Sequence, residues 1–340
     1  MHTVHLSKEN MHDYQSFITR MDGTLFYHQI MYKNMLENIL ACDSNYRLLY
    51  DGDELCGILP LLYKDGQYGK VINSLPFFGS NGGVIAKNDT CKTFLFNEYI
   101  SISNDCISSV YIENPFVVNN INPLNHTPEK RICQITNLDD IKEINDLETC
   151  FDPSKRWDIK KAIKYNVKVS KSNSEDTKNF LYETHKNHMS FLGLNWKSKD
   201  AFNFLYTNFT PELDYNIFIG KIESRMISAL LVLYYKNITE YYCPVVLPDY
   251  RNSQALSLTI YEAMKYSYKT NRNIWNWGAS GKDTNSSVYK FKEKWNSIDK
   301  NYNYHILIND ENILLKTIND LNKNYEGFFV APYSKLINKD

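Results

Sequence analysis

The sequence predicts an α/β protein made of two similar units, each a mixed, mostly antiparallel sheet flanked by helices. Three observations support this fold class. The region 218–295 reads as three strands, a short loop, a helix, a strand and a basic aromatic segment. A weaker version of the same order occurs earlier in the chain, which indicates duplication of one α/β unit. A length of 340 residues also favours two domains over one core.

The composition excludes several classes of protein. With 43% hydrophobic and 23% charged residues, the chain is typical of a globular protein. A net charge of −1 provides no global basic field, so we expect no DNA partner. The seven cysteines are scattered and never form a CxxC pair, which argues against a disulfide framework or a zinc knuckle.

No segment suggests export or membrane insertion. The N-terminus, MHTVHLSKENMHDYQ, has no apolar core of the kind a signal peptide needs. The longest apolar run, 227–235, is far short of the roughly 20 residues that span a bilayer. We therefore expect a soluble cytoplasmic protein with no transmembrane segment.

The first unit is predicted as a helix, a hairpin, a helix and a strand. Apolar residues recur at helical spacing in 27–41. The runs 46–50 and 56–63 flank an Asp-Gly turn, which is a strong hairpin signal. A helix near 88–103 and a strand at 108–114 follow.

The second unit repeats this plan with a clearer apolar pattern. The runs 217–222 and 226–235 form the predicted hairpin, and a loop containing Pro248 follows. Leu256, Ile260 and Met264 then recur on one face of a helix. A strand at 273–277 closes the unit.

The segments outside these repeats set the expected domain boundaries. The Asn- and Pro-rich stretch 114–154 reads as a junction. We expect an N-terminal domain at 1–150, a C-terminal domain at 151–310, and a tail at 311–340 that packs back on the body. Two helices, at 175–190 and 198–208, are predicted in the second domain.

The loop before the second unit's helix could bind a phosphate or a carbonyl oxygen. Helix N-termini present backbone N–H groups and the positive end of the helix dipole. Asn252 or Ser253 would cap the helix, and Arg251 would add a fixed charge. An ordinary capped helix with a surface arginine is the alternative.

The segment 278–295 follows a strand with a Gly- and Ser-containing turn. Lys290, Lys292 and Lys294 then alternate with other residues, among them Phe291 and Trp295. In an extended chain the three lysines would share one face. A lysine held there could stabilise an oxyanion or a phosphate, and a solvated strand face is the alternative.

Three further motifs carry weaker signals. In the loop 77–84, glycines around Ser80 and Asn81 could let the backbone approach a ligand, although a plain turn is the more ordinary reading. The basic segment 154–171 could face phosphate or simply solvent. His185 and His188 could share a helix face, but no third ligand stands out, so no metal is predicted.

Taken together, these pieces resemble the Fem-like branch of the GNAT acyltransferase superfamily, which includes the peptidoglycan-bridge aminoacyltransferases. A basic helix, a Tyr-Arg before the long helix, a Gly after the next strand and a closing Tyr-x-Phe-Lys-x-x-Trp occur here in the family's order. The matching stretches are 154–169, 185–194, 218–235, 247–280 and 288–295.

The resemblance implies tandem GNAT-like domains that transfer an acyl or aminoacyl group to an amine, with the acceptor in a cleft between the domains. By position, Lys292 resembles the lysine thought to polarise the transferring carbonyl, and Arg251 resembles the arginine near the donor. Glu240 lies where GNAT enzymes often place a residue that helps deprotonate the amine. The further residues expected to bind the donor phosphate are Asn252, Ser253 and Lys290. The residues expected to bind the acceptor are Ser80, Asn81, Tyr242 and Trp277.

The chain departs from the family pattern at the donor loop. The pyrophosphate motif Arg/Gln-x-x-Gly-x-Gly/Ala would fall at 251–256, where Gln254 and Leu256 occupy the two small positions. No heptad run long enough for a helical arm occurs either. The donor stays open, with acyl-CoA slightly ahead of aminoacyl-tRNA.

The predicted function is an N-acyltransferase acting on an amine of an amino sugar, a nucleotide sugar or another cell-envelope precursor. The alternatives are an aminoacyl-tRNA-dependent transferase of the peptidoglycan-bridge type and a non-catalytic protein that binds a saccharide or a partner.

Overall fold

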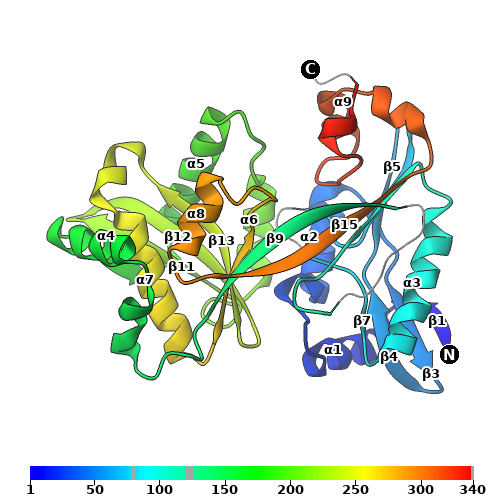
Figure 1. Ribbon diagram of the computed structural model, residues 1–340, viewed down its shortest axis with the longest axis horizontal. Helices are drawn as coiled ribbons and strands as arrows, with labels where there is room; N and C mark the ends of the chain where they lie inside the picture. The colour runs from blue at the N-terminus through cyan, green and yellow to red at the C-terminus, as the bar shows by residue number, and fades with distance from the viewer. Residues whose placement is uncertain (78–80, 119–125, 338–340) are drawn as a thin grey trace. The chain divides into compact units, whose positions relative to one another are not determined.

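The computed structural model describes residues 1–77, 81–118 and 126–337. The chain forms two compact units (Figure 1). The first comprises Met1–Arg131 and Asn301–Asp340, and the second comprises Ile132–Lys300. Both divisions fall inside long strands, β9 (Thr127–Asn137) and β15 (Ile298–Ile308), where no change of composition marks them. The sequence predicts boundaries at 150 and 310 instead, because the Asn- and Pro-rich stretch 114–154 reads as a junction and an amphipathic tail follows residue 310.

The first unit holds a four-stranded sheet in the order β1–β3–β4–β7 and a run of strands in the order β15–β8–β6–β5–β2. Its elements are β1 (His2–His5), α1 (Met11–Arg20), α2 (Ile30–Leu40), β2 (Asp43–Ser44), β3 (Arg47–Asp51), β4 (Glu54–Leu59), β5 (Leu62–Gly66), β6 (Gly69–Asn73), β7 (Ile85–Ala86), α3 (Asp89–Ser103), β8 (Ser108–Ile112) and α9 (Ile318–Asn324). The predicted helices, hairpin and strand of this unit are confirmed.

Local chemistry explains where these elements begin and turn. The β3–β4 hairpin closes at Asp51 opposite Glu54, around the Asp-Gly turn. The Asn88 side chain accepts the backbone N–H of Cys91 and so caps α3. Beyond residue 310, Leu321 and Tyr325 join Val71 of β6 in one buried cluster, so this end of the chain completes the first unit's core.

The second unit is built on a sheet with the strand order β10–β11–β12–β13–β14–β9. Its further elements are α4 (Pro153–Lys164), β10 (Lys168–Lys171), α5 (Glu175–Phe191), α6 (Lys199–Asn208), β11 (Tyr215–Ile222), β12 (Arg225–Tyr235), β13 (Ile238–Val246), the 3-10 helix η3 (Pro248–Ser253), α7 (Ala255–Lys269), β14 (Ile274–Ala279) and α8 (Ser287–Glu293). Neighbouring strands are antiparallel except β13 and β14, which are parallel. The predicted hairpin, long helix and closing strand are confirmed.

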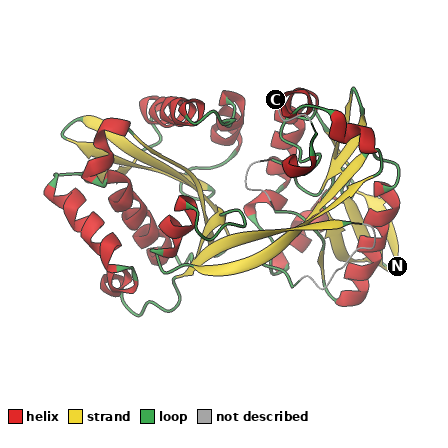
Figure 2. Ribbon diagram, turned by 45° about the horizontal axis from the view of Figure 1, so that its top comes forward, coloured by secondary structure: helices red, strands yellow, loops and turns green. Residues whose placement is uncertain are grey.

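Helices cover both faces of this sheet (Figure 2). Leu230, Val232 and Tyr234 of β12 share one core with residues of α4 and α7. The side chains that alternate with them, Leu231 and Leu233, are also buried and point to the other face. That face is covered by α5, which contacts β11, β12 and β13. The helices α4 and α5 therefore lie on opposite sides of the sheet.

One expected element is wrong. The segment 290–295 is not extended: α8 runs from Ser287 to Glu293, and the Ser286 hydroxyl caps it by accepting the N–H of Tyr289. The three lysines therefore do not share a face, because Lys290 and Lys294 are exposed while Lys292 is buried. In the basic segment 154–171, α4 is followed by the short strand β10.

The close approach of α7 to the sheet gives a test of this packing. A Cβ atom at Gly220 would lie 2.4 Å from Ser228 Oγ and 3.0 Å from Thr259 Oγ1 of α7. Those two hydroxyls are hydrogen bonded at 2.8 Å. We expect Gly220→Ala to lower the free energy of unfolding by about 1–3 kcal/mol, measured by chemical denaturation. Ser224→Ala, at the exposed turn of the same hairpin, should change it by about 0.5 kcal/mol or less. Equal stability of the two variants would contradict the packing.

Candidate active site

Strands β13 and β14 diverge at the centre of the second unit's sheet. Their parallel pairing runs only from Ile238 opposite Ile274 to Glu240 opposite Asn276. Beyond that point β13 continues to Val246 beside β12, and β14 continues to Ala279 beside β9. The two parallel strands therefore stop pairing beyond Glu240 and Asn276, and a substrate could lie at this point.

A bulge in β13 lies next to this divergence. Leu231 of β12 lies opposite Cys243, and Val232 lies opposite Tyr241, so Tyr242 is the additional residue. Bulges occur frequently beside active sites because they redirect a side chain and the local backbone. The ammonium group of Lys197 lies 4.7 Å from the centre of the Tyr242 ring.

Glu240 belongs to a buried polar network. Its Oε2 accepts a hydrogen bond of 2.8 Å from Asn276 Nδ2. Asn276 Oδ1 in turn accepts the backbone N–H of Gly278 at 2.9 Å and the thiol of Cys133 at 3.1 Å. Burial, followed by the nearby Glu240 charge, raises the pKa of Cys133 to about 12, so this thiol stays protonated and can donate.

Lys292 reaches the same network from α8. Its side chain is 5% exposed, and Nζ donates to the carbonyl oxygens of Ala279 at 2.8 Å and Gly278 at 3.3 Å. Burial lowers the pKa of Lys292 to about 8. Since Gly278 also donates to Asn276, one chain of contacts joins Lys292 to Glu240. The structure therefore brings together the two residues for which the sequence predicts catalytic roles.

Sequence reasoning missed Asn276, which connects this pair, and the residues of β9 that lie beside the network. Cys133 lies opposite Ala279, and Gln134 lies opposite Gly278, in the β9–β14 register. The hydroxyl of Ser280 donates to Gln134 Oε1 at 2.6 Å. The one available signal was Asn276, a polar residue between the two tryptophans of the strand segment IWNW.

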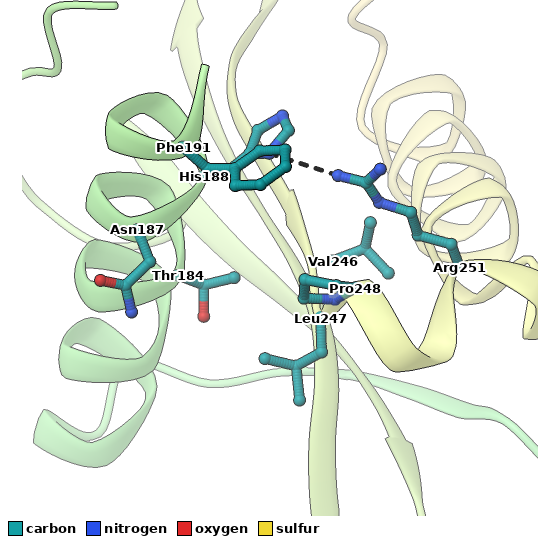
Figure 3. A pocket seen from close by; sticks show the side chains of 8 residues that line it. All are labelled: Thr184, Asn187, His188, Phe191, Val246, Leu247, Pro248 and Arg251. Carbon is teal, nitrogen blue, oxygen red and sulfur yellow. Dashed lines mark hydrogen bonds between the residues drawn. The ribbon is translucent and has the colours of Figure 1, made fainter. Parts of the chain in front are cut away.

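Arg251 lines a separate pocket of about 410 Å³ in the same unit (Figure 3). The pocket lies between α5 and the end of β13, and its walls are mostly apolar. Its lining residues are Thr184, Asn187, His188, Phe191, Val246, Leu247, Pro248 and Arg251. Arg251 Nη2 lies 3.3 Å from His188 Nδ1. Because an arginine can only donate, this imidazole nitrogen accepts, and burial and Arg251 both lower the pKa of His188.

The helix cap that the sequence predicts in the loop carrying Arg251 is wrong. Neither Asn252 nor Ser253 is the N-cap of α7, because Gln254 occupies that position. Ser253 Oγ still accepts the N–H of Ala255 at 3.3 Å, and it donates to the carbonyl of Tyr250. Gln254 has φ 59° and ψ 24°, the left-handed region that glycine favours. The loop thus follows a path that suits glycine although the glycine of the family motif is missing.

The other predicted site residues are dispersed. Trp277 is buried, and its indole N–H donates to Thr136 Oγ1 at 2.9 Å, so it serves the core. Lys290 and Asn252 are exposed. Asn81 is buried in the first unit, where Nδ2 lies 3.4 Å from the carbonyl of Glu113. Ser80 lies outside the described residues.

The two histidines of α5 have other partners. His185 Nε2 accepts the backbone N–H of Lys197 at 3.3 Å, and burial lowers its pKa to about 4. Among the residues that the structure describes, no group of three or more His, Cys, Asp or Glu is placed to hold a metal ion.

In the first unit, the corresponding pair of parallel strands stays hydrogen bonded beyond its last paired position. Strands β6 and β8 are parallel and pair up to Asn73 opposite Val110. Ser74 then continues the connection, because its N–H donates to Val110 and its hydroxyl accepts the N–H of Ile112 at 2.7 Å. A Cβ atom at Gly82 would lie 2.4 Å from the Ser74 carbonyl, so the chain at Gly82 packs directly on this connection. The divergence described above is thus not repeated at this strand pair.

Known structures share this architecture. FemX aligns with a TM-score of 0.67 and 13% identity, over 92% of this chain and 98% of its own. The C-terminal domain of a putative lysylphosphatidylglycerol synthetase from Agrobacterium fabrum aligns with a TM-score of 0.58 and 9% identity, over 95% and 98%. A tandem GNAT protein from the clavulanic acid biosynthesis pathway gives 0.53 and 9%, over 90% and 97%.

These likenesses confirm the fold that the sequence resemblance implies, a tandem GNAT-like architecture of the Fem type. Comparisons of the sequence with family models and with curated proteins give no match. In the part of the chain that the structure describes, no helix has the length and apolarity needed to cross a membrane.

Proposed function

We propose that this protein is an N-acyltransferase that moves an acyl group, acetyl or similar, from an activated donor to an amine of an amino sugar or another cell-envelope precursor. One observation carries the proposal. A carboxylate, Glu240, and a buried lysine, Lys292, are held in one network at the divergence of two parallel strands.

This pair suits the chemistry of acyl transfer. The amine nitrogen attacks the carbonyl carbon, a C–N bond forms, and the bond to the leaving sulfur or oxygen breaks. Glu240 can accept the proton that the amine loses, directly or through a water molecule. Lys292, with a pKa of about 8, is mostly protonated at neutral pH and can stabilise the oxyanion. No covalent enzyme intermediate is required.

The pocket beside Arg251 supports an acyl-CoA donor over aminoacyl-tRNA. Its apolar walls suit the slender arm and acyl group of a thioester, and the guanidinium at its rim suits a phosphate. The N-terminus of α7 adds a favourable dipole beside Arg251. A near-neutral chain offers little general attraction for tRNA.

The aminoacyl-tRNA donor is kept as the second candidate because FemX shares the fold. Purified protein should be incubated with acetyl-CoA or with charged tRNA, together with candidate amino-sugar nucleotides, and the products weighed by mass spectrometry. An acceptor 42 Da heavier, as expected for an added acetyl group, supports the first donor. Transfer that ribonuclease abolishes supports the second. Acceptor binding without transfer from either donor would identify a non-catalytic binder.

Arg251→Ala is expected to raise the KM for the donor about tenfold, because a charge-assisted contact to phosphate is lost. The effect on kcat should be smaller, since none of the residues that line this pocket belongs to the Glu240–Lys292 network. Arg251→Lys is the matched control, because it keeps the charge and should recover part of the affinity. An unchanged donor KM in Arg251→Ala would remove this pocket from the donor site.

A further inference from the structure

The outer face of α4 combines cations with large apolar side chains. The inner face of the helix, with Ile159 and Ala162, is buried in the core that it shares with α7. On the outer side, Trp157 is 58% exposed and Ile163 is 55% exposed. Tyr165, directly after the helix, is 50% exposed. Lys160 and Lys164 are exposed between them, and Lys168 extends the row onto β10.

The charge of this face is not cancelled within the helix. The one acidic residue of α4, Asp158, pairs with the buried Lys155 at 2.6 Å. Lys160 lies 3.9 Å from Glu148 but stays 70% exposed. Lys161 Nζ lies 4.8 Å from the Trp157 ring, so aromatic surface and charge are presented together. With a chain net charge of −1, this basic patch is local.

A surface exposed only to water does not account for these residue types. Lysines keep a helix soluble, but exposing Trp157 and Ile163 beside them has no benefit in water. At a bilayer surface, lysines contact lipid phosphates, and tryptophan prefers the headgroup level. Nucleic acid could contact the lysines through its phosphates and could stack a base on Trp157, but it provides no apolar environment for Ile163.

We propose that the outer face of α4, defined by Trp157, Lys160, Ile163, Lys164 and Tyr165, docks on the surface of a bilayer rich in anionic phospholipid. The contact is peripheral, because the inner face of the helix remains in the protein core. It is independent of the acyl-transfer proposal, since none of these residues belongs to the Glu240–Lys292 network or to the Arg251 pocket.

Vesicle sedimentation tests the proposal with the full-length protein. Wild type should co-sediment with vesicles made of phosphatidylcholine and phosphatidylglycerol in equal parts, but not with phosphatidylcholine alone. Binding should weaken as salt is added. The double variant K160E/K164E should lower the partition coefficient at least about tenfold, since each lysine near an anionic surface contributes a factor of about five. Trp157→Ala should lower it several-fold.

Matched controls separate this face from general charge. K8E/K323E reverses two exposed lysines of the first unit, changes the net charge equally, and should leave binding unchanged. Leu194→Ala removes an exposed apolar side chain from the loop after α5, across the sheet from α4, and should have no effect. All variants should keep the wild-type melting temperature. If K160E/K164E does not fold, Trp157→Ala and Lys164→Gln are used in its place, and each should lower binding to the anionic vesicles.

Equal binding by wild type and the α4 variants would overturn the proposal. So would wild type that binds neither vesicle. Binding to tRNA at the same salt concentration, lost in K160E/K164E and without vesicle binding, would assign this face to nucleic acid instead.

Discussion

Lys292→Ala is expected to lower the turnover of acyl transfer about a hundredfold or more, while the fold is retained. Loss of one preorganised group that stabilises an oxyanion typically costs a factor of this size. The variant removes a buried cation that donates to the carbonyls of Gly278 and Ala279. Single-turnover measurements with saturating donor would report the chemical step directly.

Lys292→Met is the matched control for packing. It keeps an unbranched apolar stem within a buried site and removes only the ammonium group. If the charge matters, both variants lose turnover equally. If turnover survives in Lys292→Met but not in Lys292→Ala, the lysine serves packing, and its proposed catalytic role is wrong.

The pKa of Lys292 adds a second signature. Burial lowers this pKa from an ordinary value of 10.5 to about 8, so the ammonium form is lost as pH rises through 8. Wild-type kcat should therefore fall above about pH 8, and the residual activity of Lys292→Met should not show this fall. Stability should move the other way. Between pH 8 and 10.5 the unfolded chain holds the proton of this lysine and the native protein does not. The contribution of Lys292 to the free energy of unfolding should therefore rise with pH across that window.

Much of the fold is encoded in local patterns that a sequence shows directly. The Asp-Gly turn predicts the β3–β4 hairpin, and apolar spacing predicts α7. The prediction for the segment of α8 was wrong because its alternating lysines fit the period of a strand. The Ser286 cap, and the burial of Lys292 together with Trp295 three residues later, fit a helix instead. Two periodicities fit a segment this short, and tertiary packing decides between them.

The site was predicted only in part, for a similar reason. Glu240 and Lys292 follow from family position, but their connection depends on residues from three strands and a helix. The register of β9 against β14 is what places Cys133 beside Asn276, and no local pattern reports that register. Likewise, the sequence motif records only whether glycine is present, so it does not predict that Gln254 adopts the left-handed backbone conformation.

Asymmetry between the two units sharpens the proposed function. Each has a pair of parallel strands at its centre, but Ser74 joins the pair of the first unit beyond its last register position. In the second unit the last register position is Glu240 opposite Asn276, and the two strands diverge directly after it. A duplicated fold needs only one reaction centre, and the polar network supports placing it in the second unit.

Asn276→Ala is expected to lower turnover about tenfold to a hundredfold, although Asn276 itself need not touch substrate. Its side chain orients Glu240 through Nδ2 and fixes the Gly278 peptide through Oδ1. Loss of either contact lets a reacting group move, and small displacements are costly in a preorganised site. Since a buried polar group is removed, a loss of stability of about 1–3 kcal/mol should accompany the change.

Asn303→Ala supplies the control for that loss of stability. Asn303 Nδ2 donates to Glu113 Oε2 at 3.0 Å, so it makes the same type of amide-to-carboxylate contact in the first unit rather than in the second. This variant should lose comparable stability and keep its turnover. If both asparagine variants lose turnover equally, global destabilisation explains the result.

A double-mutant cycle then decides whether Asn276 acts through the network. If Asn276 positions the same groups that Lys292 serves, Asn276→Ala combined with Lys292→Ala should be little slower than Lys292→Ala alone. Residues that act as one unit are non-additive in this way. Losses that multiply would mean that Asn276 and Lys292 contribute independently. The chain of contacts through Gly278 would then be structural, and the proposed mechanism would need Glu240 and Lys292 to work without it.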